Sequence, residues 1–242
     1  MIEQWDILDT PDGPMGLYVV RPDGDEALPA VVSFHHGPGL DDGSKEAMAR
    51  IAGWGYVVVS HDRYHRDGEW IVMDMRTPSE EDRNRFFEIF LGATDERVAA
   101  DLDVVLAFLD GDPGVRPGPM GCVGYCIGGR SVLRALAAHP DRFRSGVALH
   151  PSRCTTDEAD SPHLSIPSLT ASLYVGFGAE DTSQSPADNQ DMIGLVDARP
   201  TGEVEIHDGA VHGFAVPGRS YHPAAADRSY DRARALFAAA LA

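Results

Sequence analysis

The chain has 242 residues, 43% of them apolar, and carries a formal net charge of -18. That length accommodates one α/β domain, and the apolar share is enough for a packed core. So strong a negative charge argues against nucleic acid or an anionic membrane surface as a partner.

Apolar runs alternate with amphipathic runs along the chain, which predicts strands alternating with helices. The predicted strands are Trp5–Leu8 paired with Met15–Val20, then Pro29–Phe34, Tyr56–Val59, the run before Gly124, Gly146–Leu149, Ser172–Gly176 and Glu203–Ile206. The predicted helices are Ser44–Ile51 with Ser44 as N-cap, Asp95–Leu109, Ser131–Ala138, Asp188–Val196 and Ala224–Leu241. Residues 61–94 form too long a polar stretch for a plain connection, so we expect a lid or a partly helical segment.

This alternation predicts an α/β fold, with a mostly parallel sheet covered by helices on both faces. No repeat, linker or change of composition divides residues 1–242, so we expect a single domain. Ligands of such sheets bind beyond the carboxyl ends of the strands. Residues just after strands are therefore the candidates for chemistry.

The stretch Gly121–Arg130 contains Gly124-Tyr125-Cys126-Ile127-Gly128 between a strand-like run and a helix-like run. A sharp strand-to-helix turn of the form Gly-x-nucleophile-x-Gly is a nucleophile elbow, in which small residues allow strand and helix to approach closely. Free N–H groups and the positive end of the following helix would favour a thiolate at Cys126. The alternative is a glycine-rich turn that merely contains a buried cysteine.

Two downstream residues complete the order Cys, Asp, His. Asp181 follows an apolar strand through a glycine turn, and it is predicted to orient an imidazole; Glu180 and Asp188 are nearby competitors. His212 lies in a late loop, and it is predicted to act as general base toward Cys126. The chain has ten histidines, so a surface or capping histidine is the alternative.

Three cysteines cannot form a complete set of disulfides, and this indicates a reducing, cytoplasmic location. Cys122 and Cys154 are interpreted as ordinary small buried residues. The acidic segment Met1–Asp6 lacks the features of a signal peptide, and no apolar run is long enough to span a bilayer.

Three short motifs together resemble the dienelactone hydrolase family, also called carboxymethylenebutenolidase, of the α/β-hydrolase superfamily. They are Gly124–Gly129, Gly178–Asp181 and Val211–Phe214. The cysteine at the elbow is the most specific of these features, because most α/β hydrolases carry serine there. The resemblance implies an α/β-hydrolase fold, a Cys-His-Asp triad, no metal, no organic cofactor, and a small-molecule ester or lactone as substrate.

The chain departs from that family at two places. Dienelactone-cleaving members carry a glutamate that pairs with the resting thiol, and His36 stands there in this chain. They also carry a carboxylate-binding arginine four residues after the catalytic histidine, where this chain has Val216. Arg83 and Arg85 are candidates for supplying positive charge to the substrate, and a solvated helical face is the alternative.

The predicted reaction begins with attack of the Cys126 thiolate on an ester carbonyl. It continues through a thioester that is hydrolysed by a water molecule activated by His212. The backbone N–H of Ile127, together with that of His36 or Gly37, is predicted to stabilise the oxyanion.

Two other functions stay open at this point. One is an acyltransferase or thioester-handling enzyme with the same triad, and the other is a catalytically inactive hydrolase-like binding protein. The sequence contains neither an HExxH motif nor a paired-cysteine zinc pattern, so no metal site is predicted. A monomer and a small homo-oligomer are both compatible with the sequence.

Overall fold

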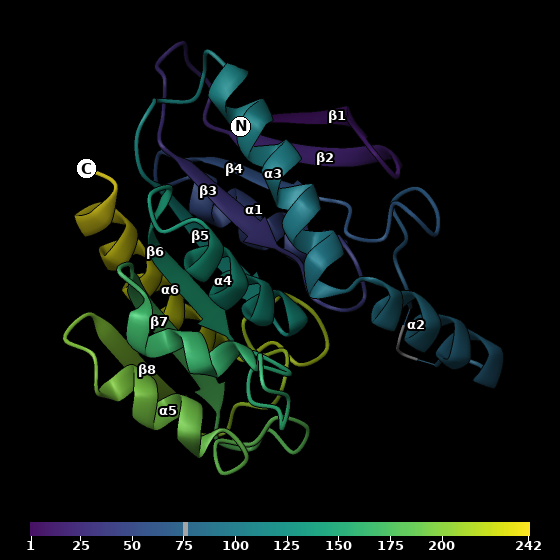
Figure 1. Ribbon diagram of the computed structural model, residues 1–242, viewed down its shortest axis with the longest axis vertical. Coiled ribbons are helices and arrows are strands. Elements are labelled where there is room, and N and C mark those ends of the chain that lie inside the picture. The colour runs from purple at the N-terminus through teal and green to yellow at the C-terminus, as the bar shows by residue number, and fades with distance from the viewer. Residues whose placement is uncertain (75–76) are drawn as a thin grey trace.

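The structure is a computed structural model that describes residues 1–74 and 77–242. Within these ranges one sheet of eight strands runs in the order β1-β2-β4-β3-β5-β6-β7-β8 (Figure 1). The strands are β1 (Ile2–Thr10), β2 (Gly13–Arg21), β3 (Ala30–Phe34), β4 (Val57–His61), β5 (Met120–Tyr125), β6 (Phe143–Leu149), β7 (Ser172–Gly178) and β8 (Gly202–His207). The helices are α1 (Asp42–Ala52), α2 (Glu80–Gly92), α3 (Asp95–Gly111), α4 (Ile127–Ala138), α5 (Gln190–Asp197) and α6 (Pro223–Ala240), with a 3₁₀ helix at Pro162–Ser168.

The sheet is parallel from β4 through β8, and the β1–β2 hairpin adds an antiparallel edge. The predicted pairing of the first two strands is confirmed, with Trp5 opposite Tyr18. The predicted mostly parallel sheet is confirmed as well.

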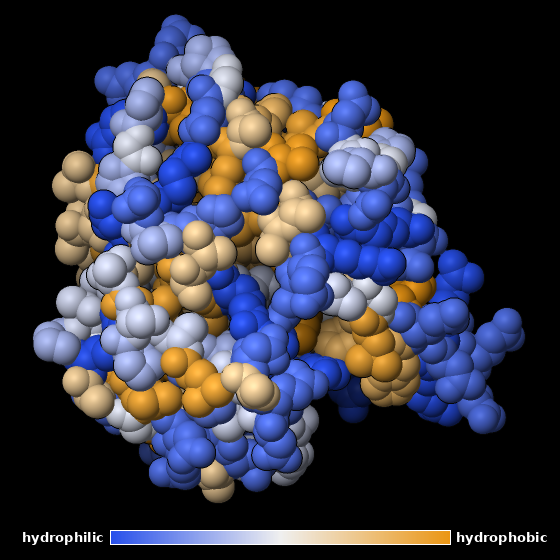
Figure 2. Space-filling view, viewed as in Figure 1, coloured by the Kyte–Doolittle hydropathy of each residue, from blue (hydrophilic) through white to orange (hydrophobic). Residues whose placement is uncertain are grey.

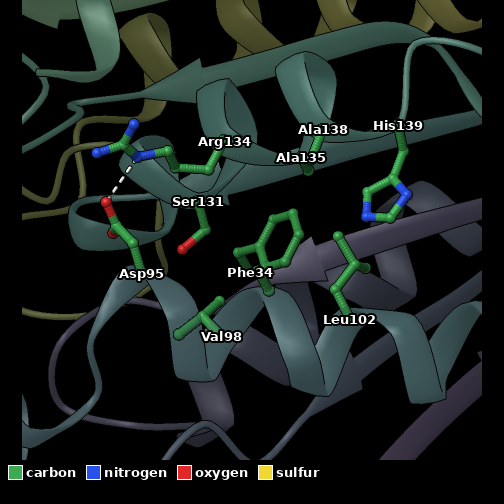
Figure 3. A pocket seen from close by; sticks show the side chains of 10 residues that line it. Phe34, Asp95, Val98, Leu102, Ser131, Arg134, Ala135, Ala138 and His139 are labelled. Carbon is green, nitrogen blue, oxygen red and sulfur yellow. Dashed lines mark hydrogen bonds and ion pairs between the residues drawn. The ribbon is translucent and has the colours of Figure 1, made fainter. Parts of the chain in front are cut away.

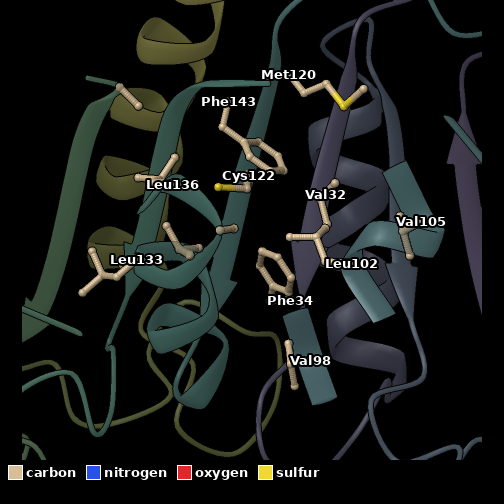
Figure 4. Close-up of a cluster of buried hydrophobic side chains, with 14 of the residues drawn as sticks. Val32, Phe34, Val98, Leu102, Val105, Met120, Cys122, Leu133, Leu136 and Phe143 are labelled. Carbon is tan, nitrogen blue, oxygen red and sulfur yellow. The ribbon is translucent and has the colours of Figure 1, made fainter. Parts of the chain in front are cut away.

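Helices cover both faces of the sheet, as the alternating pattern predicts. Side chains of α3, α4 and α5 pack on one face in one buried cluster, to which Leu102, Leu133 and Met192 belong. Figure 4 shows Leu102 and Leu133 within it. Side chains of α1 and α6 pack on the other face, where Met48 and Phe237 belong to a second cluster. The inner strands β3, β4, β5 and β7 bury both of their faces, which explains their continuous apolar sequences.

Two helix starts differ from the prediction by more than two residues. Helix α1 is capped by Asp41 rather than by Ser44, because the Asp41 Oδ1 accepts a hydrogen bond from the Ser44 backbone N–H at 2.8 Å. Helix α4 begins at Ile127, four residues before the predicted start at Ser131. Glycine is a poor helix former, so the local sequence pattern does not predict the first turn of α4.

The long polar stretch is partly helical. Helix α2 begins after a capping box in which the Ser79 hydroxyl accepts from the Asp82 N–H and the Asp82 carboxylate accepts from the Ser79 N–H. It lies at the lower right of Figure 1, beyond the edge of the layered core. None of the helices in the described part of the chain has the length and apolar character needed to cross a membrane.

The parallel register brings the carboxyl ends of several strands to one edge. Phe34 is level with Gly124, Tyr125 with Leu149, and Leu149 with Gly176. Residues that follow β3, β5, β6 and β7 therefore meet at this edge, and the candidate site is built there.

Candidate active site

Cys126 stands in the single-residue turn between β5 and α4. Its backbone has φ 55° and ψ −119°, a conformation that is rare for a residue with a side chain. A Cβ at Gly124 would lie 2.1 Å from the Gly128 carbonyl oxygen, and one at Gly128 would lie 2.1 Å from that of Phe34. Only glycine fits at these two positions, so the sequence pattern and the sharp turn have the same cause.

Residues that follow β6 support this turn from the neighbouring strand. The Cys126 N–H donates to the Leu149 carbonyl oxygen at 3.1 Å and to the His150 Nδ1 at 3.2 Å. The Ser152 Oγ lies 3.4 Å from the Cys126 Sγ. Our reading of the sequence missed His150 and Ser152, although their place just after a predicted strand was the available signal.

An acid and an imidazole complete the arrangement. The His212 Nδ1 lies 2.7 Å from the Asp181 Oδ2, and the imidazole lowers the pKa of the Cys126 thiol. The other Asp181 oxygen accepts from the Ser183 N–H and hydroxyl and from the Gln184 N–H, at 2.8 to 2.9 Å. Asp181 is 2% exposed, and these donors hold its carboxylate toward the ring.

The two competing acids lie elsewhere. Glu180 is exposed, and the Asp188 carboxylate accepts a hydrogen bond from the Ser185 hydroxyl within its own loop. Among the three acids, Asp181 alone contacts the imidazole.

The electrostatics of the site favour a thiolate beside an imidazolium. Burial opposes ionisation of the thiol, but the hydrogen bond and charge of His212, the Ser152 hydroxyl and the charge of His36 lower the pKa of Cys126 to about 7. Burial also opposes protonation of His212, but its hydrogen bonds with Asp181 and Cys126 raise its pKa well above the usual range. The pKa of Asp181 is depressed, because the hydrogen bond from His212 outweighs the effect of burial.

His150 stays neutral beside this pair. Its ring is fully buried, with its centroid 5.1 Å from that of His212 in an edge-on arrangement. Burial and the positive charge of His212 lower the pKa of His150 far below the usual value for histidine. Its Nδ1 therefore remains an acceptor for the Cys126 N–H.

The loop after β3 approaches the elbow from the opposite side. The His36 carbonyl oxygen lies 2.7 Å from the His35 Nδ1 and accepts from the Gly39 N–H at 3.1 Å. The Tyr64 hydroxyl donates to the Gly37 carbonyl oxygen at 2.7 Å. The His36 C=O and the Gly37 N–H belong to one trans peptide and point in opposite directions, so the bonds to the His36 carbonyl also fix the direction of the Gly37 N–H. The bond from Tyr64 holds the next peptide, whose nitrogen is that of Pro38.

The His36 side chain forms an ion pair with the cap of α1. Its Nε2 lies 3.0 Å from the Asp41 Oδ2, and its side chain is 14% exposed. The charge of His36 acts on Cys126 and helps to lower the pKa of the thiol. The imidazole that stands where the resemblance implies a glutamate is thus held by Asp41.

Helix α2 lies against the loop after β3. Phe86 and Phe90 face Gly37, where a Cβ would lie 3.3 Å from the Phe86 ring and 3.5 Å from that of Phe90. Figure 2 shows apolar surface over the α2 region at the lower right, where Phe87 and Leu91 are 55% and 57% exposed.

The two candidate arginines of α2, Arg83 and Arg85, are both exposed. The Arg83 Nη1 donates to the carbonyl oxygen of Pro78, which precedes the helix. Neither lines a described cavity.

A cavity of about 250 Å³ opens beside the elbow. It is lined by Phe90, Leu91, Thr94, Asp95, Glu96, Ile127, Arg130, Arg153, Glu158 and Asp160. A second cavity, of about 10 Å³, is enclosed between α3 and α4 and is too small for a substrate (Figure 3). In the described ranges no three side chains of His, Cys, Asp or Glu are grouped as a metal site requires.

Comparisons with known proteins show the family to which the chain belongs. A model of the dienelactone hydrolase family matches residues 15–241. A Synechocystis protein named "Putative carboxymethylenebutenolidase" is 24% identical over 91% of this chain and 89% of its own. A Salmonella typhimurium protein of the same name is 27% identical over 93% and 82%.

The fold also has a close structural counterpart. The crystal structure of a Klebsiella pneumoniae protein described as a "Putative Dienelactone Hydrolase" covers 98% of both chains with a TM-score of 0.84 and 24% identity.

Proposed function

Because this chain belongs to the dienelactone hydrolase family, and is therefore a hydrolase of ester or lactone bonds, we propose that it acts through a triad of Cys126, His212 and Asp181 and a thioester acyl-enzyme. The observation that carries the proposal is the 2.7 Å contact between Asp181 and His212, together with the lowering of the Cys126 pKa by the His212 imidazole. The sulfur stands at a strained elbow, with the first N–H groups of α4 beside it.

Acylation starts from the thiolate. The Cys126 sulfur attacks the carbonyl carbon, a C–S bond forms, and the carbonyl oxygen becomes an oxyanion. Collapse breaks the bond to the leaving oxygen, and the His212 imidazolium gives that oxygen its proton. The alcohol or enol part leaves and the acyl group stays on sulfur; for a lactone, both parts remain in one molecule.

Deacylation runs the same sequence with water. Neutral His212 removes a proton from the water molecule, whose oxygen attacks the thioester carbon. The second tetrahedral intermediate expels the Cys126 thiolate and releases the carboxylic acid. Asp181 holds the ring orientation and stabilises the imidazolium at both stages.

Two backbone donors are proposed for the oxyanion. The Ile127 N–H is the first in α4, and the Gly37 N–H has its direction fixed by the bonds that His35 and Gly39 make to the His36 carbonyl of the same peptide. Tyr64 holds the following peptide of the loop through the Gly37 carbonyl. The His36 N–H is the alternative partner from the same loop. Loss of one such donor costs an enzyme about 3 kcal/mol of transition-state stabilisation.

The His36–Asp41 pair indicates that the thiolate forms without help from a substrate. No carboxylate of the described residues contacts the sulfur, and His36 stands where a proton-accepting glutamate would be. We propose that Cys126 is ionised in the resting enzyme.

The setting proposed for the enzyme follows from this chemistry. All three cysteines are free, and a thiolate persists best in a reducing compartment, so we propose the cytoplasm. We also propose that residues 1–242 act as one domain, since both buried clusters are built on the same sheet.

Turnover of a chromogenic acyl ester by wild type and by Cys126→Ala tests the proposal. Wild type should release the chromophore and Cys126→Ala should not. Cys122→Ala is the matched control, because burial raises the pKa of the Cys122 thiol far out of the working range and this residue should not react. Equal turnover by wild type and Cys126→Ala would contradict the proposal.

A further inference from the structure

Arg63 is a buried cation that the proposed reaction leaves without a role. It follows β4 and is 6% exposed. Its Nη2 lies 3.5 Å from the Ser131 Oγ, at the long limit of a hydrogen bond, and its Nε is buried without a partner. No carboxylate in the described ranges forms an ion pair with its guanidinium.

The two carboxylates whose charge reaches Arg63 are already bound to other cations. Asp95 accepts from the Arg130 Nε and Nη2 at 2.8 Å and from the Arg134 Nε at 2.6 Å; Figure 3 shows the Asp95–Arg134 pair. Asp101 accepts from the Arg66 guanidinium at 2.9 Å through both oxygens and lies 3.2 Å from the His65 ring.

The neighbouring imidazoles neither add to nor offset the positive charge of Arg63. Burial, together with the positive charge of Arg63, lowers the pKa of both His35 and His61. Both rings are therefore neutral near neutral pH. The guanidinium stays charged, since arginine does not lose its proton in proteins at such pH.

Its position links this charge to both proposed oxyanion donors. Ser131 lies one turn beyond Ile127, on the side of α4 that faces α3 (Figure 3). The guanidinium carbon lies 6.0 Å from the centre of the Tyr64 ring, and the Tyr64 hydroxyl holds the Gly37 carbonyl. Arg63 therefore lies behind the elbow and behind the loop that faces it.

We propose that Arg63 is a positioning residue whose unneutralised charge stabilises the Cys126 thiolate and the oxyanion formed on attack. The inference rests on the proposed function for its catalytic part, but its effect on the thiol stands independently. A charge inside a protein is felt more strongly than one in water because the surroundings screen it less. Burying an arginine without a counterion is costly for the fold, which favours a functional reason for its presence.

Several other charges act on the same sulfur and must stay constant in a test. His212, in the loop after β8, and His36, in the loop after β3, both act on the Cys126 sulfur. The charge of Cys126 also acts on the Tyr64 hydroxyl. Asp181 acts on it through His212. A substitution at Arg63 alters none of these side chains.

The test measures the ionisation of the thiol directly. Wild type and Arg63→Met are treated with iodoacetamide between pH 5 and 10, and the alkylation rate of Cys126 is followed by mass spectrometry. We expect the midpoint to rise by about one pH unit in Arg63→Met, which is about a tenfold slower reaction at pH 6. Arg63→Lys, which keeps the charge, should stay near the wild-type midpoint.

Arg144→Met is the matched control, because it removes an equal charge from an exposed site on β6 whose guanidinium donates to Pro140. Arg63→Gln is measured in parallel, so that a folded uncharged variant is available if methionine is not accepted. Thermal unfolding of the same proteins separates the two roles, since loss of an unpaired buried charge should leave the melting temperature equal or higher.

Midpoints for Arg63→Met and Arg63→Gln that equal the wild-type value would overturn the inference. A lower melting temperature with an unchanged midpoint would show that Arg63 is structural. If the midpoint shifts but wild type cleaves no ester, the inference on the thiol stands and the proposed function fails.

Discussion

Replacing Asp181 by asparagine tests how the thiolate is maintained. Asp181 accepts from the His212 Nδ1 at 2.7 Å and keeps that ring protonated, and the protonated ring lowers the pKa of Cys126 to about 7. In Asp181→Asn the thiol pKa should rise toward its ordinary value of 9.0. At pH 7 the ionised fraction would then fall from about one half to about 1%, which is about fifty-fold.

Two assays follow this change. The alkylation rate of Cys126 at pH 7 should fall about 10- to 50-fold, since Ser152 and His36 still act on the sulfur, and the rates should converge with wild type above about pH 9.5. Ester turnover should fall further, by about 10² to 10⁴, because the amide can present an N–H to His212 and invert its tautomer.

Glu180→Gln is the matched control, since this neighbouring acid is exposed and should behave as wild type. A pH dependence of alkylation that is unchanged in Asp181→Asn, in a protein that is folded by circular dichroism, would refute the reasoning.

Two further substitutions test the supports of the site. Tyr64→Phe removes the donor at 2.7 Å from the Gly37 carbonyl, so kcat should fall about tenfold with KM unchanged; an unchanged kcat would show that this bond does not position the oxyanion loop. Asp41→Ala removes the cap of α1, so urea unfolding at pH 7 should show a loss of about 1 kcal/mol. The hydrogen bond and charge of His36 outweigh burial and lower the pKa of Asp41 to about 2, from 3.8. The stabilisation is therefore present above about pH 4 and declines as pH falls toward 2, and the difference from wild type should shrink in that window. Asp42→Ala, at an exposed carboxylate, should change stability by less than about 0.5 kcal/mol at either pH.

The sequence predicted the order of the strands and helices along the chain because their periodicity is local. The local pattern alone predicts a strand at the apolar run Val57–Val59 and a helix from the stripe through Val98, Leu102 and Leu109. Glycine spacing likewise predicted the elbow, since the close approach of Gly124 to Gly128 is a contact between residues four apart.

Local sequence patterns did not predict the contacts between segments that are distant in the chain. His150 and Ser152 contact Cys126 only because β6 lies beside β5 in the sheet, and adjacency of strands is a property of the whole fold. Arg63 stands in a polar stretch of the sequence, and its burial depends on distant contacts such as that with Ser131 of α4.

Single residues at helix ends were also ambiguous. Asp41 and Ser44 are both good N-caps, and the position of the loop after β3 determines which of them caps α1. The ion pair of His36 with Asp41 follows from that choice, so the replacement for the family glutamate could be located but its partner could not.

The most direct measurement is the mass of the enzyme during turnover. The protein is mixed with an activated acyl ester, quenched in acid within the first turnover, digested and mapped by mass spectrometry. The account predicts an added acyl group on the peptide that contains Cys126, released by hydroxylamine at neutral pH and absent in Cys126→Ala. Ester cleavage with no acyl group on that peptide, or with the acyl group on another residue, would contradict the account.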